Sequence, residues 1–146
     1  ETARLAKTLA GVTGGDLFEI KPQTNYTAAD LNWNDSSSRS TLEMKDDKSR
    51  PAMAGPADVA QYDVVFVGFP IWWYQAPRII ETFLESCDFS GKTLVPFATS
   101  GGSGMGKTES ILKACCAPTA KWLPGKRLSS RESAASVRKW VDSLGL

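Results

Sequence analysis

The hydrophobic positions in the first third of the chain predict a helix, a short strand and a long polar segment. Leu5, Leu9 and Val12 recur at the spacing of one helix face, and glycines follow them. Residues 16–20 (Asp-Leu-Phe-Glu-Ile) alternate as a short strand would. Residues 23–55 are polar and have no sustained apolar stripe. This segment therefore predicts loops with one or two short surface helices.

The rest of the chain alternates strand and helix patterns. Residues 62–68 (Tyr-Asp-Val-Val-Phe-Val-Gly) form an apolar run typical of a strand buried on both faces. Such alternation indicates an α/β domain with a parallel sheet and helices on both faces, and 146 residues suit one domain over 1–146. The other predicted elements are strands over 93–98 and 119–123, and helices over 77–86, from 109 to about 116, and from about 130 onward.

Composition narrows the possible functions. The formal net charge is +1 and lysines and arginines do not cluster, which disfavours nucleic-acid binding. No apolar run approaches the roughly 20 residues of a membrane span, and no signal peptide is visible. We therefore expect no membrane span and a cytoplasmic protein.

The side chains offer little independent chemistry. The chain has no histidine, which removes the commonest general base, the Ser-His-Asp triad and most zinc sites, so no metal site is expected. Three cysteines do not make a disulfide framework. The adjacent Cys115 and Cys116 are either a redox pair or packing residues. Any catalysis is therefore expected to depend on a bound cofactor.

A glycine-rich segment at Gly101–Thr108 (GGSGMGKT) fits the phosphate-binding pattern of nucleotide triphosphatases. Such enzymes also need an apolar strand that ends in an aspartate, which holds Mg²⁺. The strand at 64–67 ends in Gly68, and Asp142 falls in the predicted last helix. We therefore interpret the match as a coincidence and expect Lys107 not to bind phosphate.

Two loops are the candidate site, because ligands of open parallel sheets bind at the carboxyl ends of the strands. They span residues 68–76 and 99–106. The first contains three consecutive aromatic residues, Trp72-Trp73-Tyr74, which cannot all point into the core. The second exposes backbone donors and lets a flat ring approach closely. A planar ligand is the first interpretation. An aromatic lid or a protein interface is the alternative.

With these two loops the chain resembles the flavodoxin-like family, and most closely a bacterial branch with Y/F-P-I-W-W and T-x-G-G-S-G motifs. The motifs are Phe69–Trp73 and Thr99–Gly104 here, and the likeness extends to Phe89–Thr93 and to the last residues, Ser143–Leu146. Flavin-dependent quinone reductases share related segments. The resemblance implies a three-layer sandwich with an open parallel sheet of order 2-1-3-4-5.

The resemblance also implies FMN as the cofactor and electron transfer through it, with no catalytic side chain. The partner would be a redox protein or a small electron acceptor. A small flavin-dependent quinone-type reductase and a flavin-free interaction module that uses the aromatic loop are the alternatives. The implied cofactor-binding residues are Pro70, Ile71, Trp72, Trp73, Tyr74, Thr99, Ser100, Gly101, Gly102 and Ser103.

The chain departs from the family pattern in two respects. Family members open with an apolar strand and a loop rich in Ser, Thr and Gly, which cradles the flavin phosphate at a helix N-terminus. Here a helix pattern begins at Glu1-Thr2, so we expect a preceding segment and weak FMN binding without it. The family's electron carriers are usually strongly acidic, whereas the formal charge here is +1. That charge favours the reductase alternative.

Overall fold

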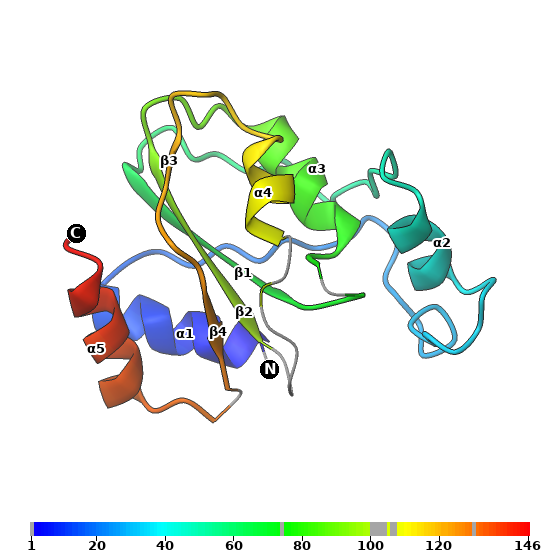
Figure 1. Ribbon diagram of the computed structural model, residues 1–146, viewed down its shortest axis with the longest axis horizontal. Helices are drawn as coiled ribbons and strands as arrows, with labels where there is room; N and C mark the ends of the chain where they lie inside the picture. Colours follow the sequence, from blue (N-terminus) through cyan, green and yellow to red (C-terminus); the bar gives the residue numbers. More distant parts are fainter. Residues whose placement is uncertain (1, 74, 100–104, 106–107, 130) are drawn as a thin grey trace.

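The computed structural model has a four-stranded parallel sheet at its centre (Figure 1). β1 (Val64–Pro70) pairs with β2 (Thr93–Thr99) along its whole length. β3 (Lys121–Trp122) and β4 (Lys126–Leu128) pair with the other edge of β2, one near its start and one near its end. The structure describes residues 2–73, 75–99, 105, 108–129 and 131–146.

β3 and β4 form one strand with an interruption. Leu123 still donates its amide to the carbonyl oxygen of Leu94 at 2.9 Å. Pro124 then has no N–H to offer. The amide of Gly125 turns away from the sheet and donates to the Glu109 carboxylate at 2.8 Å. The ladder resumes at Lys126.

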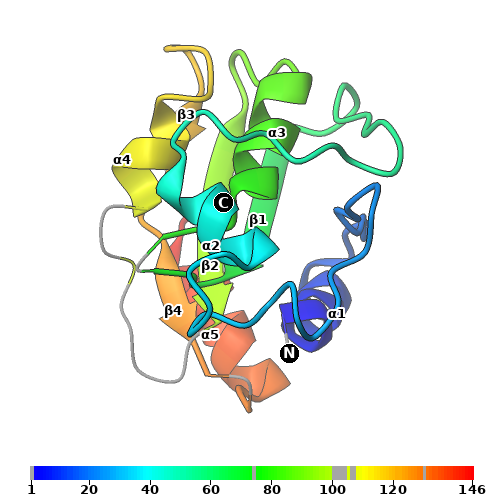
Figure 2. The same cartoon turned by 90° about the vertical axis from the view of Figure 1, so that its right-hand side faces the viewer.

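Helices cover both faces of the sheet and make three layers (Figures 1 and 2). α1 (Thr2–Thr13) and α5 (Ala134–Ser143) lie on one face. α3 (Arg78–Ser86) and α4 (Thr108–Lys113) lie on the other. α2 (Arg39–Lys45) lies outside these layers, towards the carboxyl edge of the sheet.

Two apolar clusters hold the layers together, because successive strand residues point to opposite faces. Leu94 of β2 packs with the α3 and α4 side chains, and the next residue, Val95, packs with α1 and α5. Burying each such side chain stabilises the fold by about 1.5–3 kcal/mol. The first cluster includes Val67, Phe69, Phe83, Leu84, Phe89 and Leu112, and the second includes Leu5, Leu9, Phe97, Val137 and Trp140.

Gly68 is required by the packing of β1 against β2. It lies opposite Phe97 in the parallel register. A Cβ at this position would come within 2.2 Å of Cζ of the Phe97 ring. The ring therefore occupies the space above the glycine, and any other residue at position 68 would displace it.

Most predicted elements are confirmed, with small differences at their ends. The last helix begins at Ala134 and not near position 130, because the Ser133 side chain caps it by accepting a hydrogen bond from the Ser136 amide at 3.1 Å. β4 has no counterpart in the prediction. No helix of the described residues is long and apolar enough to cross a membrane.

The strand predicted at 16–20 is wrong. This segment contains no strand residues. A strand needs a neighbouring backbone to bond with, and none of the described residues forms a strand on the outer edge of β1. The observed sheet accordingly supplies the 3-4-5 part of the expected order 2-1-3-4-5.

The outer edge of β1 faces an apolar slot of about 860 Å³. Its walls are β1, the helices α1 and α3, and residues 15–20 with Pro22. The slot ends at Pro70 and Trp72, beside the first candidate loop. The slot lies between the same two helix layers as β1.

Candidate functional site

The two candidate loops leave the sheet side by side. Pro70 and Thr99 are paired in the parallel register, as the last residues of β1 and β2. One residue further, the amide of Ile71 donates to the carbonyl oxygen of Thr99 at 3.3 Å. The structure therefore brings Pro70, Ile71 and Thr99 together at the carboxyl edge, as the sequence predicts.

The N-terminal end of α1 reaches the same edge. The hydroxyl groups of Thr2 and Thr99 form a hydrogen bond of 2.8 Å. Thr99 is buried, with 4% of its surface exposed. Its side chain thus ties the first turn of α1 to the end of β2, and a helix N-terminus lies at the carboxyl edge of the sheet.

The first loop contains a tight turn, which we call the aromatic turn (residues 72–75). Its ends bond to each other twice: Trp72 donates to Gln75 at 2.8 Å and Gln75 donates to Trp72 at 3.0 Å. Trp73 follows Trp72 with a φ of 48°, in the left-handed region. Glycine and asparagine adopt this region far more easily than a bulky residue such as tryptophan. The turn therefore holds Trp73 in a strained conformation.

The side chains of the first loop divide between solvent and protein. Trp73 is exposed, at 40% of its surface, which confirms that the three aromatics do not all point inward. Trp72 is half-buried and meets the ring of Tyr26 edge-on, with centroids 5.6 Å apart. Ile71 packs against the α3 side of the core.

Part of the predicted site lies outside the described residues. These positions are Tyr74, Ser100, Gly101, Gly102 and Ser103.

Three residues around the aromatic turn were not predicted: Tyr26, Gln75 and Arg78. Tyr26 comes from the polar segment 23–55, where nothing in the local pattern marks it. Arg78 is 2% exposed, although it begins an apolar helix. A cation in a first helical turn is disfavoured by the helix dipole, and that is the one sequence signal that could have drawn attention to it.

The cysteines have the surroundings of packing residues. Burial raises the pKa of the Cys115 thiol to about 12 and that of Cys116 to about 11, and carboxylates at Glu81 and Glu85 add to the shift at Cys115. Both thiols are free and contact the core beside α3. A thiol that stays protonated is a poor nucleophile, so this environment favours packing over a redox pair.

The surroundings of the glycine-rich segment do not suit a triphosphatase. Thr108, the residue that would bind Mg²⁺, is fully buried. Glu109, which follows Thr108, accepts a hydrogen bond from the Gly125 amide at 2.8 Å. Lys107 itself lies outside the described residues. Among the described residues no group of three or more His, Cys, Asp or Glu is placed to hold a metal ion.

Solved structures resemble this fold over nearly its whole length. A flavoprotein of Bacteroides eggerthii is 47% identical, with a TM-score of 0.92, over 99% of this chain and 91% of that one. A flavoprotein of Bacteroides uniformis is 48% identical, with a TM-score of 0.91, over 97% and 90%. The flavoprotein of Lactobacillus acidophilus in complex with FMN is 19% identical, with a TM-score of 0.71, over 100% and 91%. The last likeness concerns the fold alone.

A comparison with curated proteins gave no significant match. A comparison with protein families matches residues 1–144 to the family named Flavodoxin. This match covers almost the whole chain and agrees with the parallel sheet, the three layers and the paired loops at its carboxyl edge. The chain therefore belongs to the flavodoxin family.

Proposed function

We propose that this protein binds FMN at the aromatic turn and transfers electrons through the bound flavin. The observation that carries the proposal is the position of the turn. It presents a strained, exposed Trp73 at the sheet edge where β2 ends beside it. Strained residues of this kind cluster at ligand sites, where the surrounding structure holds them in place.

The first loop suits the flat face of a flavin better than its polar edge. The amides of Ile71, Trp72 and Gln75 already donate hydrogen bonds within the loops. What the described part of the turn offers is the indole of Trp73, and stacked aromatic pairs contribute about 0.5–1.5 kcal/mol beyond burial. Donors to the polar edge of the ring are left to Ser100, Gly101, Gly102 and Ser103 of the second loop.

The flavin supplies the electron-accepting ring, and the side chains of the protein need not act as acid or base. The chain has no histidine, and its contribution is to hold the ring and to set its potential by stacking and hydrogen bonding. Backbone N–H dipoles near the ring stabilise negative charge on it.

The N-terminus of α1 is the place for the flavin phosphate. Helix N-termini favour anions, and this one lies beside Thr99 at the same edge as the aromatic turn. A Ser/Thr/Gly loop before Thr2 would complete this anchor. Without it we propose that FMN binds weakly.

The charge of the protein bears on its partner. A net charge of +1 gives little long-range attraction to a basic protein partner. This favours a small acceptor such as a quinone over a carrier role between proteins.

The cysteines bear on the cellular location. Unpaired cysteines among the described residues are in keeping with a reducing, cytoplasmic location, which we include in the proposal.

Titration with FMN tests the proposal through tryptophan fluorescence. We expect FMN to quench the emission, and the quenching to fall strongly in Trp73→Ala. Trp33→Ala is the matched control, since Trp33 is 71% exposed in the polar segment. If FMN at high concentration leaves the emission of the unmodified protein unchanged, the flavin proposal fails and the flavin-free interaction module is the better reading. If FMN does bind, turnover of a quinone with a reduced nicotinamide distinguishes a reductase from a carrier.

A further inference from the structure

A single buried arginine joins the aromatic turn to α2. Arg78 donates from Nη1 to Gln75 Oε1 at 3.2 Å and from Nη2 to the carbonyl oxygen of Met44 at 2.7 Å. Its Nε donates to the carbonyl oxygen of Glu43 at 3.3 Å. These two carbonyls belong to the end of α2, where a cation is favourable.

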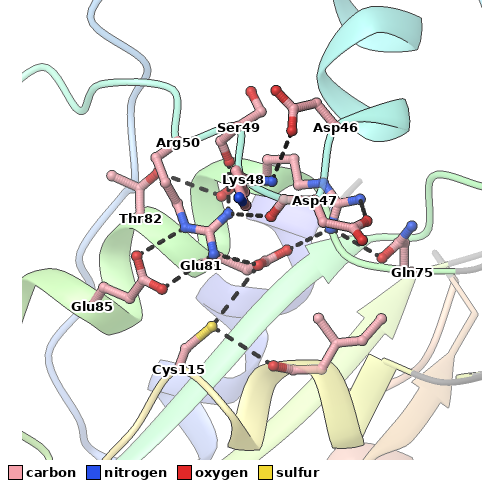
Figure 3. A network of polar contacts seen from close by, with 12 residues as sticks. Asp46, Asp47, Lys48, Ser49, Arg50, Gln75, Glu81, Thr82, Glu85 and Cys115 are labelled. Atoms are coloured by element: carbon pink, nitrogen blue, oxygen red, sulfur yellow. Dashed lines mark hydrogen bonds and ion pairs between the residues drawn. The ribbon is translucent and has the colours of Figure 1, made fainter.

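The charge of Arg78 is balanced within the same cluster, part of which Figure 3 shows. Glu81, itself 4% exposed, accepts from Nη1 at 2.8 Å, and Asp47 accepts from Nη2 at 3.2 Å. Arg50 in turn pairs with Glu81 at 3.1 Å. All five donors of a guanidinium fork can be used in this arrangement, which a lysine could not reproduce.

The other end of the turn is held by Tyr26. Its ring meets Trp72 edge-on, and its hydroxyl donates to Glu43 Oε1. Arg39 lies over the Tyr26 ring, with its guanidinium carbon 3.8 Å from the ring centroid, and pairs with Glu43 Oε2 at 3.1 Å. Burial, with the Glu43 bond, raises the pKa of Tyr26 well above its ordinary value, so the phenol remains a donor.

Glu43 is the point at which these two sets of contacts meet. Its carboxylate binds Tyr26, which contacts Trp72, and its backbone carbonyl binds Arg78, which contacts Gln75. Trp72 and Gln75 are the two residues that close the aromatic turn by their paired hydrogen bonds. The contacts therefore connect the two ends of the turn to each other through Glu43 of α2.

We propose that α2 acts as a brace for the aromatic turn, with Tyr26 and Arg78 as positioning residues that Glu43 links. The brace holds Trp73 in its left-handed conformation by fixing the residues on both sides of the turn. Its effect on the turn is a property of the protein alone. Its effect on flavin affinity and potential rests on the proposed function.

Hydrogen exchange of the protein without ligand tests the brace directly. Tyr26→Phe keeps a ring against Trp72 but removes the hydroxyl that binds Glu43. We expect it to speed exchange of the Trp72 and Gln75 amides roughly ten- to a hundredfold, the factor of one lost charge-assisted hydrogen bond. Tyr62→Phe is the matched control, because it removes the bond from another tyrosine hydroxyl to a carboxylate, that of Asp16. The control should leave both amides unchanged.

Arg78→Lys weakens the contacts that hold Gln75, at the other end of the turn. It should also speed exchange of the Trp72 and Gln75 amides. Should this variant fail to fold, Tyr26→Phe and Glu43→Ala decide the question, since both alter polar contacts that are only half-buried. Unchanged exchange in these two variants would overturn the brace. FMN affinity and midpoint potential form a second readout, which we expect to shift in Tyr26→Phe and not in Tyr62→Phe. If the unmodified protein binds no FMN, the proposed function fails, while the exchange rates still decide the brace.

Discussion

The amide of Ile71 donates to the carbonyl oxygen of Thr99 at 3.3 Å, one step beyond the paired residues that end β1 and β2. This bond continues the hydrogen-bond pattern between β1 and β2 by one residue, into the candidate site. The loop with the aromatic turn therefore starts from a position set by the central strands. A site that begins on rigid strands can hold a flat ligand in a defined orientation.

Gly68→Ala is expected to destabilise the fold by about 1–3 kcal/mol, the usual cost of overpacking a core. The added Cβ would lie 2.2 Å from Cζ of Phe97, so either the ring or the strand must shift. Urea unfolding measures the difference. Gly55→Ala is the control, since nothing lies within 4 Å of a Cβ there. Phe97→Leu should recover part of the loss in the double variant, and equal stabilities for the two alanine variants would contradict the packing described.

Trp73→Asn should separate stability from ligand binding. Asparagine adopts the left-handed region more easily, so we expect the free energy of unfolding to stay within about 0.5 kcal/mol of the original or to rise. FMN affinity should fall at the same time, because the exposed indole is lost. Trp33→Asn should change neither quantity. A clear loss of stability in Trp73→Asn would show that the indole packs against the protein and is not held free for a ligand.

Cys115 and Cys116 should resist alkylation in the folded protein. With pKa values of about 12 and about 11, their thiolate fractions at pH 8 are roughly 10⁻⁴ and 10⁻³, against about 0.2 for an unperturbed thiol of pKa near 8.5. Labelling by iodoacetamide should therefore be at least roughly a hundredfold slower than in the unfolded chain. The rate should rise about tenfold per pH unit between pH 8 and pH 10. Mass spectrometry of the peptide with both residues measures this, and equal rates in the folded and unfolded chains would refute it.

An apolar strand placed before α1 should fill the slot beside β1. β1 has seven residues, so a parallel partner of about the same length, at about 3.3 Å per residue, would end at the edge where α1 begins. We expect such an extension to stabilise the fold. If it ends in a Ser/Thr/Gly loop it should also tighten FMN binding by several powers of ten, since each charge-assisted hydrogen bond to phosphate contributes about 1.5–3 kcal/mol.

The control for this extension is the same strand followed by a loop of bulky residues that cannot cradle an anion. It should stabilise the fold as well without the gain in affinity. Titration of FMN into the two extended proteins and into the unextended chain measures the difference. Equal affinities in all three would place the phosphate site elsewhere.

Lys107→Ala should leave FMN affinity within about twofold, because we assign no phosphate to this lysine. The preceding glycines fit the triphosphatase pattern, but Thr108 is buried and Glu109 is bonded to Gly125. We expect no ATP hydrolysis from the unmodified protein. Hydrolysis that disappears in Lys107→Ala would restore the nucleotide interpretation.

Local pattern determined much of this protein. The spacing of Leu5 and Leu9 predicted α1, and the apolar run at 62–68 predicted β1, because each depends on the period of a single element. The parallel arrangement followed from the alternation of strands and helices. Since all carboxyl ends of a parallel sheet share one edge, the position of the two candidate loops could also be predicted, and Pro70, Ile71 and Thr99 lie there together.

Contacts between distant segments decided the rest. Residues 16–20 carry a strand pattern but remain outside the sheet, because a strand forms only beside another backbone. Tyr26 and Arg78 are far apart in sequence, yet each contacts one end of the aromatic turn, and Glu43 binds both of them. Periodicity reports which face of an element is apolar. Which polar side chain meets which neighbour depends on how the elements pack, and that is settled only by the tertiary structure.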